Sequence, residues 1–183
     1  MFPLKRQISA LFLILILIFP VNIYIIGDAI GAGLQSSFIR YQQTYLGTSV
    51  ITLAGDLGYV TSGTIGNQSA LSILLWALGT ALLLAAAGYF IYSRYNNIAE
   101  IRKPLALLTT GGAVAYLLSC IAQYGPTFHG PAGLSIPVGV PLIFAIAVYI
   151  LKAEDDEPEY EEEGEGDWEE TEEGDDGQGV EEE

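Results

Sequence analysis

Four long apolar stretches dominate the hydropathy pattern of residues 1–152. They cover residues 10–27, 70–92, 105–124 and 134–151, and none contains Asp, Glu, Lys, Arg or His. A helix needs about 20 mainly apolar residues to cross the ~30 Å hydrocarbon layer of a bilayer. One charge at the middle of such a helix costs ~2.5 to 3.5 kcal/mol of insertion free energy. The pattern therefore predicts an all-α membrane protein, a four-transmembrane-helix bundle.

The first apolar stretch has two interpretations. Lys5 and Arg6 precede it, and the small residues Ala29 and Gly31 follow it, which is also the order found in a signal peptide. A signal peptide usually has an apolar core of about 7 to 15 residues, and this stretch is longer. An uncleaved anchor is favoured, with a cleaved signal peptide as the alternative.

The loop between the first two stretches, residues 28–69, carries two weaker patterns. Residues 29–46 predict a helix, because large apolar side chains recur there every three or four positions and share one helical face. These residues are Ile30, Leu34, Phe38, Tyr41 and Tyr45. After Gly47, β-branched residues flank the turn-like sequence Ala54–Gly58, which predicts a short β-hairpin.

The basic residues predict an orientation. Lys and Arg next to short loops stay on the cytoplasmic side of a membrane. Six of the seven bases fall on one side of the predicted spans, and only Arg40 falls on the other. The six are Lys5, Arg6, Arg94, Arg102, Lys103 and Lys152. We therefore expect a multi-pass protein of the cell membrane with both termini in the cytoplasm and residues 28–69 outside.

Charge divides the chain into a membrane domain, residues 1–152, and an acidic tail, residues 153–183. The tail holds 19 of the 22 acids and no base, so it predicts a disordered cytoplasmic segment. Tyr160 and Trp168 are its aromatic residues, and aromatic side chains set among acids predict docking to a basic cytoplasmic protein. The alternative is a tail that only keeps the protein soluble at its cytoplasmic face.

Small residues spaced four apart predict where the helices pack. In a bilayer, close approach of small side chains holds helices together. We expect contacts among these helices, with a second copy or with other membrane proteins. The residues are Ala77, Ala81, Ala85 and Gly88 in the second stretch, and Gly111, Ala115 and Ser119 in the third.

Candidate chemistry is sparse. Asp28 and Asp56 are expected to form turns or cap helices, while His129 and Cys120 lack further ligand types nearby in the sequence. No catalytic, metal or cofactor site is predicted, and nucleic-acid binding is not expected. The sequence favours a non-enzymatic assembly or interaction protein with a docking tail. The alternatives are a small oligomeric pore or transport accessory subunit, which would be lined by Thr109, Thr110, Ser119 and Gln123, and a membrane-embedded enzyme.

Overall fold

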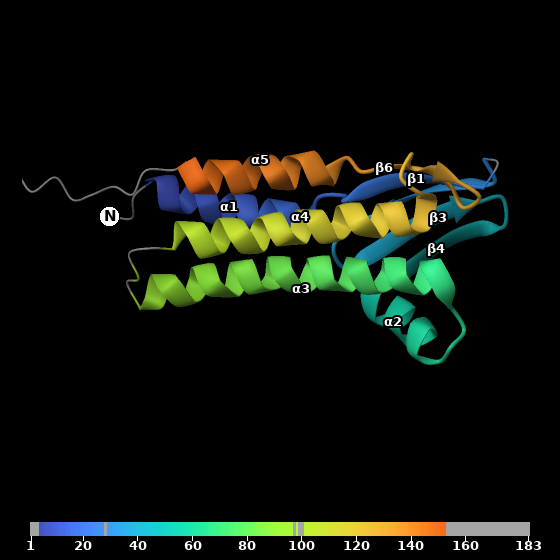
Figure 1. Ribbon diagram of the computed structural model, residues 1–183, viewed down its shortest axis with the longest axis horizontal. Coiled ribbons are helices and arrows are strands. Elements are labelled where there is room, and N and C mark those ends of the chain that lie inside the picture. The colour runs from blue at the N-terminus through green and yellow to red at the C-terminus, as the bar shows by residue number, and fades with distance from the viewer. Residues whose placement is uncertain (1–3, 28, 97, 99–100, 153–183) are drawn as a thin grey trace, which may run out of the picture.

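The computed structural model describes residues 4–27, 29–96, 98 and 101–152, which form a mixed α/β fold (Figure 1). Its described elements are five helices and six strands. The helices are α1 (Leu4–Ile18), α2 (Leu53–Thr61), α3 (Asn67–Tyr95), α4 (Arg102–Tyr124) and α5 (Gly139–Lys152). The strands are β1 (Asn22–Ile26), β2 (Gly31–Gln35), β3 (Ile39–Thr44), β4 (Gly47–Thr52), β5 (His129–Gly130) and β6 (Gly133–Ile136).

Two of the described helices are long and apolar enough to cross a membrane, judged by length and composition. They are α3 with 29 residues and α4 with 23 residues, and they contain the predicted stretches 70–92 and 105–124. Pro104 lies in the first turn of α4, where its missing N–H removes no helical hydrogen bond. The helix ends before Gly125, whose φ of 84° is costly for any other residue.

The prediction of four transmembrane helices is wrong, because the first and fourth apolar stretches each divide into a helix and a strand. In the first, α1 ends at Ile18, just before Pro20, and β1 follows. In the fourth, β6 ends at Ile136, and α5 begins after Pro137. Proline interrupts the helical hydrogen-bond pattern and disfavours helix in the residue before it. With 15 and 14 residues, α1 and α5 are each shorter than a spanning helix of about 20.

The predicted helix over residues 29–46 is also wrong, because this segment forms β2 and β3 of an antiparallel sheet in the order β4-β3-β2-β1-β6-β5. Gly31 and Gly33 permit the close approach of the neighbouring strands. A Cβ at Gly33 would lie 2.5 Å from the ring of Tyr24, whose hydroxyl crosses this position to donate to the carbonyl of Tyr41 at 3.3 Å.

The hairpin predicted around Ala54–Gly58 is wrong, because only the residues before this sequence form a strand, β4, and β4 pairs with the preceding strand β3. The sequence Ala54–Gly58, predicted as a turn, instead lies in α2. This helix follows β4 directly, because Oγ1 of Thr52 accepts a hydrogen bond from the N–H of Gly55 at 3.1 Å and caps it.

The helices and the sheet occupy opposite ends of the long axis (Figure 1). At one end, α1 and α5 lie beside the C-terminal half of α3 and the N-terminal half of α4. At the other end, the sheet takes the place of α1 and α5 beside α3 and α4. The helical end is held by a shared apolar core that includes Leu13, Leu83, Leu105 and Ile143. A cavity lies at the junction between the two halves.

Candidate functional site: the cavity between helices and sheet

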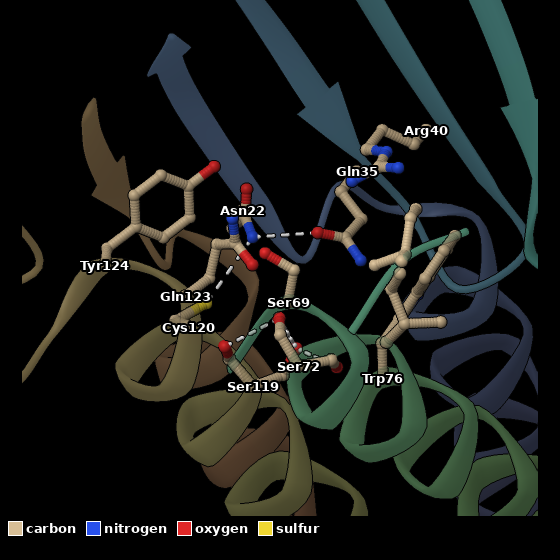
Figure 2. A pocket seen from close by; sticks show the side chains of 12 residues that line it. Asn22, Gln35, Arg40, Ser69, Ser72, Trp76, Ser119, Cys120, Gln123 and Tyr124 are labelled. Atoms are coloured by element: carbon tan, nitrogen blue, oxygen red, sulfur yellow. Dashed lines mark hydrogen bonds between the residues drawn. The ribbon is translucent and has the colours of Figure 1, made fainter. Parts of the chain in front are cut away.

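A cavity of about 200 Å³ lies where the beginning of α3 and the end of α4 meet the sheet (Figure 2). Its wall combines hydroxyl, amide and guanidinium groups with a few large apolar side chains. It is lined by Asn22, Gln35 and Arg40 from the sheet, by Ile65, Ser69, Ser72, Ile73 and Trp76, and by Ser119, Cys120, Gln123 and Tyr124 from α4.

A pair of serines joins α3 to α4 in the floor of the cavity. The hydroxyl of Ser72 donates to the carbonyl of Ser119 at 2.9 Å, and the hydroxyl of Ser119 donates to the carbonyl of Ser72 at 2.8 Å. The two hydroxyl oxygens lie 3.0 Å apart (Figure 2). This reciprocal arrangement fixes the distance between the helices through small polar side chains, as is common between helices in lipid.

Asn22 connects the sheet to α4 at the side of the cavity. Its Nδ2 donates to Oε1 of Gln35 at 3.1 Å and to Sγ of Cys120 at 3.4 Å (Figure 2). The residue is only 3% exposed, and its Oδ1 has no hydrogen-bond partner among the described residues. A buried carbonyl oxygen without a partner is costly, so this atom favours a bound hydrogen-bond donor.

Arg40 brings a positive charge to the cavity, and Asp56 of α2 balances it. Nη2 of Arg40 lies 2.8 Å from Oδ1 and 2.7 Å from Oδ2 of Asp56. Burial raises the pKa of the Asp56 carboxyl, and the neighbouring Arg40 opposes this rise. Nε of Arg40 is buried and has no hydrogen-bond partner within the described part of the chain. The ion pair therefore neutralises the charge while one N–H stays available.

Beside this cavity, the turn between β2 and β3 is fastened to the helices through a buried polar network. Nε1 of Trp76 donates to the carbonyl of Ser36 at 2.9 Å, and Oγ1 of Thr80 donates to the carbonyl of Ser37 at 2.7 Å. The hydroxyl of Tyr116 donates to Oγ of Ser37 at 3.0 Å and lies 3.1 Å from Oγ1 of Thr80. This network fixes the level of the sheet along α3.

The chemistry of the cavity suits the binding of a small polar molecule. Amides and hydroxyls supply both donors and acceptors, and the charge of Arg40 is already paired. Within the described ranges, no three His, Cys, Asp or Glu side chains lie close enough together to hold a metal ion. His129 is exposed on β5, while Cys120 is buried in the cavity wall.

The residues predicted for helix packing lie at different depths. Ala77 and Gly111 are half-buried, Ala115 and Ser119 are buried, and Ser119 forms the serine pair with Ser72. In the single chain, Ala81, Ala85 and Gly88 are exposed. Their role in contacts with another copy stays a prediction.

Gly79 and Gly112 lie where α3 and α4 approach each other closely, and the four-residue spacing did not select them. A Cβ on Gly79 would lie 2.7 Å from ring atoms of Tyr116, and a Cβ on Gly112 would lie 2.9 Å from Cδ2 of Leu83. The adjacent small residues Gly79-Thr80 and Gly111-Gly112 were the available sequence signal.

Asp28 and the tail residues Tyr160 and Trp168 lie outside the residues that the structure describes. Asp56 was predicted as a turn-forming or capping residue, but it lies inside α2 and pairs with Arg40, while Thr52 caps the helix. Comparison with known proteins shows no matching family model and no matching curated protein.

Proposed function

We propose that the chain is an integral membrane protein in which α3 and α4 cross the bilayer, with the sheet and the cavity outside and both termini in the cytoplasm. The observation that supports this orientation is the separation of basic residues from the sheet. The beginning of α1, the end of α3, the beginning of α4 and the end of α5 lie at the same end of the molecule (Figure 1). This end carries six of the seven bases of the chain.

The seventh base, Arg40, is on β3 and pairs with Asp56. Positive charge next to a spanning helix favours the cytoplasmic side, and a base neutralised by an ion pair contributes little to that preference. The charge distribution around α3 and α4 therefore supports a cytoplasmic helical end and an outer sheet.

We infer a non-enzymatic assembly or interaction role within this arrangement. Ala81, Ala85 and Gly88 of α3 are small and exposed in the single chain, which favours packing against another helix. Tyr160 and Trp168 in the acidic tail favour a second contact, with a basic cytoplasmic protein.

Topology is tested by cysteine labelling in a Cys120→Ala background. Leu46, at the tip of the β3–β4 hairpin, is 82% exposed, and Lys152 is exposed at the end of α5. A membrane-impermeant maleimide added to intact cells is expected to label Leu46→Cys, and to label Lys152→Cys only after permeabilisation. The reverse pattern would overturn the orientation, and labelling of both positions in intact cells would contradict a crossing.

The interaction role is tested by crosslinking and affinity purification. The full chain is compared with a chain that ends at Lys152 and with the full chain carrying Tyr160→Ala and Trp168→Ala. We expect both variants to lose the same cytoplasmic partner. Identical partner lists for all three proteins would leave the tail with a solubilising role only.

A second candidate function, binding of a small polar molecule, is supported by the unpartnered Oδ1 of Asn22 in the cavity wall. Native mass spectrometry of the protein released from lipid nanodiscs tests it. A bound small molecule is expected with the natural chain and should be lost with Ser72→Leu, which fills the cavity. A natural chain that carries water alone would reject this candidate.

A further inference from the structure

The sheet turns its polar face toward the helices and its apolar face away from them. The face toward α3 and α4 carries Asn22, Gln35 and Arg40, which line the cavity. The opposite face carries Ile23, Ile25 and other apolar side chains that no described residue covers. In a protein surrounded by water, the apolar face of a sheet would instead pack against the helices.

An apolar row crosses five strands on the outward face. The strand register places Ile136 beside Ile23, Ile23 beside Leu34, Leu34 beside Tyr41, and Tyr41 beside Val50. All except the half-buried Tyr41 are exposed. Directly opposed residues in neighbouring strands share a face, so these side chains form one continuous band. None of the five carries a charge.

The level of this band along α3 follows from two hydrogen bonds. Trp76 and Thr80 donate to the carbonyls of Ser36 and Ser37 in the turn between β2 and β3, so this turn lies beside residues 76–80 of α3. The exposed leucines of α3 continue past that level to Leu74 and Leu71. At ~1.5 Å per residue, Leu71 lies roughly 8 Å further outward than Trp76. If Leu71 and Leu74 face lipid, the part of the sheet beside the turn between β2 and β3 lies at a similar depth in the bilayer.

The lengths of α1 and α5 agree with this depth. Helices of 15 and 14 residues extend about 21 to 22 Å, some 8 Å less than a hydrocarbon layer of ~30 Å. At ~3.3 Å per strand residue, two or three residues cover the remaining depth. Counted back from the start of α5, three residues reach Ile136 of β6. The strand register places Ile23 of β1 directly beside Ile136, so both residues of the band lie near this depth.

Hydrocarbon requires backbone groups to be hydrogen-bonded within the protein, and β1 and β6 pair with each other at this level. Ile23 and Ile136 pair with each other, and the N–H of Ser135 donates to the carbonyl of Phe128 at 2.9 Å. At the same end of β6, Pro137 has no N–H to satisfy. At the opposite edge, α2 begins immediately after β4.

We infer that the part of the band nearest the helices, Ile23, Leu34 and Ile136, contacts the acyl chains of the outer leaflet. The sheet is thus seated in the membrane surface and not held clear of it. This inference rests on the proposed membrane crossing by α3 and α4. Lipid is the occupant that continues the surface already exposed by Leu71 and Leu74, and it requires no complementary charge.

Spin labelling tests this contact. Single cysteines replace Ile23, Ile136, Leu74 and Leu46 in the Cys120→Ala background, and each labelled protein is reconstituted in phosphatidylcholine liposomes. Electron paramagnetic resonance then compares collisions with oxygen, which concentrates in lipid, and with a water-soluble nickel chelate. Leu74→Cys is the reference for lipid, and Leu46→Cys is the reference for water. We expect Ile23→Cys and Ile136→Cys to resemble Leu74→Cys, with oxygen collisions several-fold more frequent than at Leu46→Cys.

The two references separate failure of the inference from failure of the proposed crossing. If Leu74→Cys reports lipid while Ile23→Cys and Ile136→Cys report water, the sheet contact is rejected and the crossing stands. If the two sheet positions are shielded from both reagents, a second copy or another protein covers the band, and the lipid assignment is overturned. If Leu74→Cys itself reports water, the proposed crossing fails and the inference fails with it.

Discussion

A single nitrogen of Arg40, Nη2, lies within 2.8 Å of both carboxylate oxygens of Asp56. The contact joins β3 to α2 and places an acid that is 0% exposed beside a cavity lined mostly by neutral groups. A charge pair therefore ties α2 to the sheet, whereas α1 and α5 are held by apolar packing.

Asp56→Ala is expected to destabilise the protein by about 2 to 3 kcal/mol, because it leaves the Arg40 guanidinium without its counter-charge. Removing one partner of a fully buried pair costs ~3 to 5 kcal/mol, and the 25% exposure of the Arg40 side chain reduces this penalty. Unfolding in detergent, followed by circular dichroism, measures the change. Combining Arg40→Met with Asp56→Leu should restore part of the loss, and equal losses in both proteins would contradict an uncompensated charge as the cause.

The pH dependence of stability should carry the signature of Asp56. Burial raises the pKa of this carboxyl above its ordinary value of 3.8, so the folded protein binds more protons than the unfolded chain between the two pKa values. The contribution of Asp56 to stability is therefore largest below 3.8 and declines as the pH rises to the folded pKa. Melting temperatures of the natural chain and Asp56→Asn, compared from pH 3 to pH 8, test this sign. The natural chain should lose stability relative to the variant as the pH rises, and a relative gain would contradict the prediction.

Gly79→Ala should separate α3 from α4. The added methyl group would lie 2.7 Å from Tyr116, and overpacking of this kind costs about 1 to 3 kcal/mol. Gly88→Ala, on the same helix, is the matched control, since a Cβ at Gly88 would meet no atom within 4 Å. We expect the control to be neutral or slightly stabilising in the same detergent unfolding assay. Equal effects of the two variants would show that helix propensity, and not packing, determines the result.

Thr80→Val is expected to cost about 1 to 3 kcal/mol, because it removes a hydroxyl that serves the carbonyl of Ser37 and the hydroxyl of Tyr116. Thr80→Ser retains that hydroxyl and provides the control. Hydrogen exchange of the backbone amides of residues 36–39 reports on the turn between β2 and β3. We expect faster exchange in Thr80→Val but not in Thr80→Ser. Unchanged exchange in both variants would show that the hydrogen bonds of Thr80 do not hold the turn in place.

The sequence predicted α3 and α4 because each contains one uncharged apolar run that is long enough to form a single spanning helix. It did not predict β1 and β6, because hydropathy does not distinguish helix from strand. The β-branched residues of Asn22–Ile26 and the prolines at positions 20 and 137 carried the missing information. Residues 29–46 satisfied the helical spacing by coincidence, while Gly31 and Gly33 indicated close strand approach.

The cavity was beyond sequence reasoning for a different reason. Its wall joins Asn22 and Arg40 to Ser72 and Ser119, which are brought together only by the long-range pairing of the sheet with the helices. Only Ser119 was named from the helix-packing pattern, and Gln123 from the pore alternative. The Arg40–Asp56 pair gave no sequence signal, since a spacing of 16 residues across a strand and a helix has no characteristic period.

The pairing of β1 with β6 also sets an order for biosynthesis. Ile26 and its partner Gly133 are 107 positions apart, and Gly139 donates its N–H to the carbonyl of Val21 at 2.8 Å beside the same junction. At a ribosomal rate of ~5 to 20 residues per second, β6 is synthesised roughly 5 to 20 s after β1. During that interval one edge of β1 is open, as is its apolar face. A nascent chain held by a chaperone or by the insertion machinery would be protected from strand exchange with another chain until β6 emerges and closes the sheet.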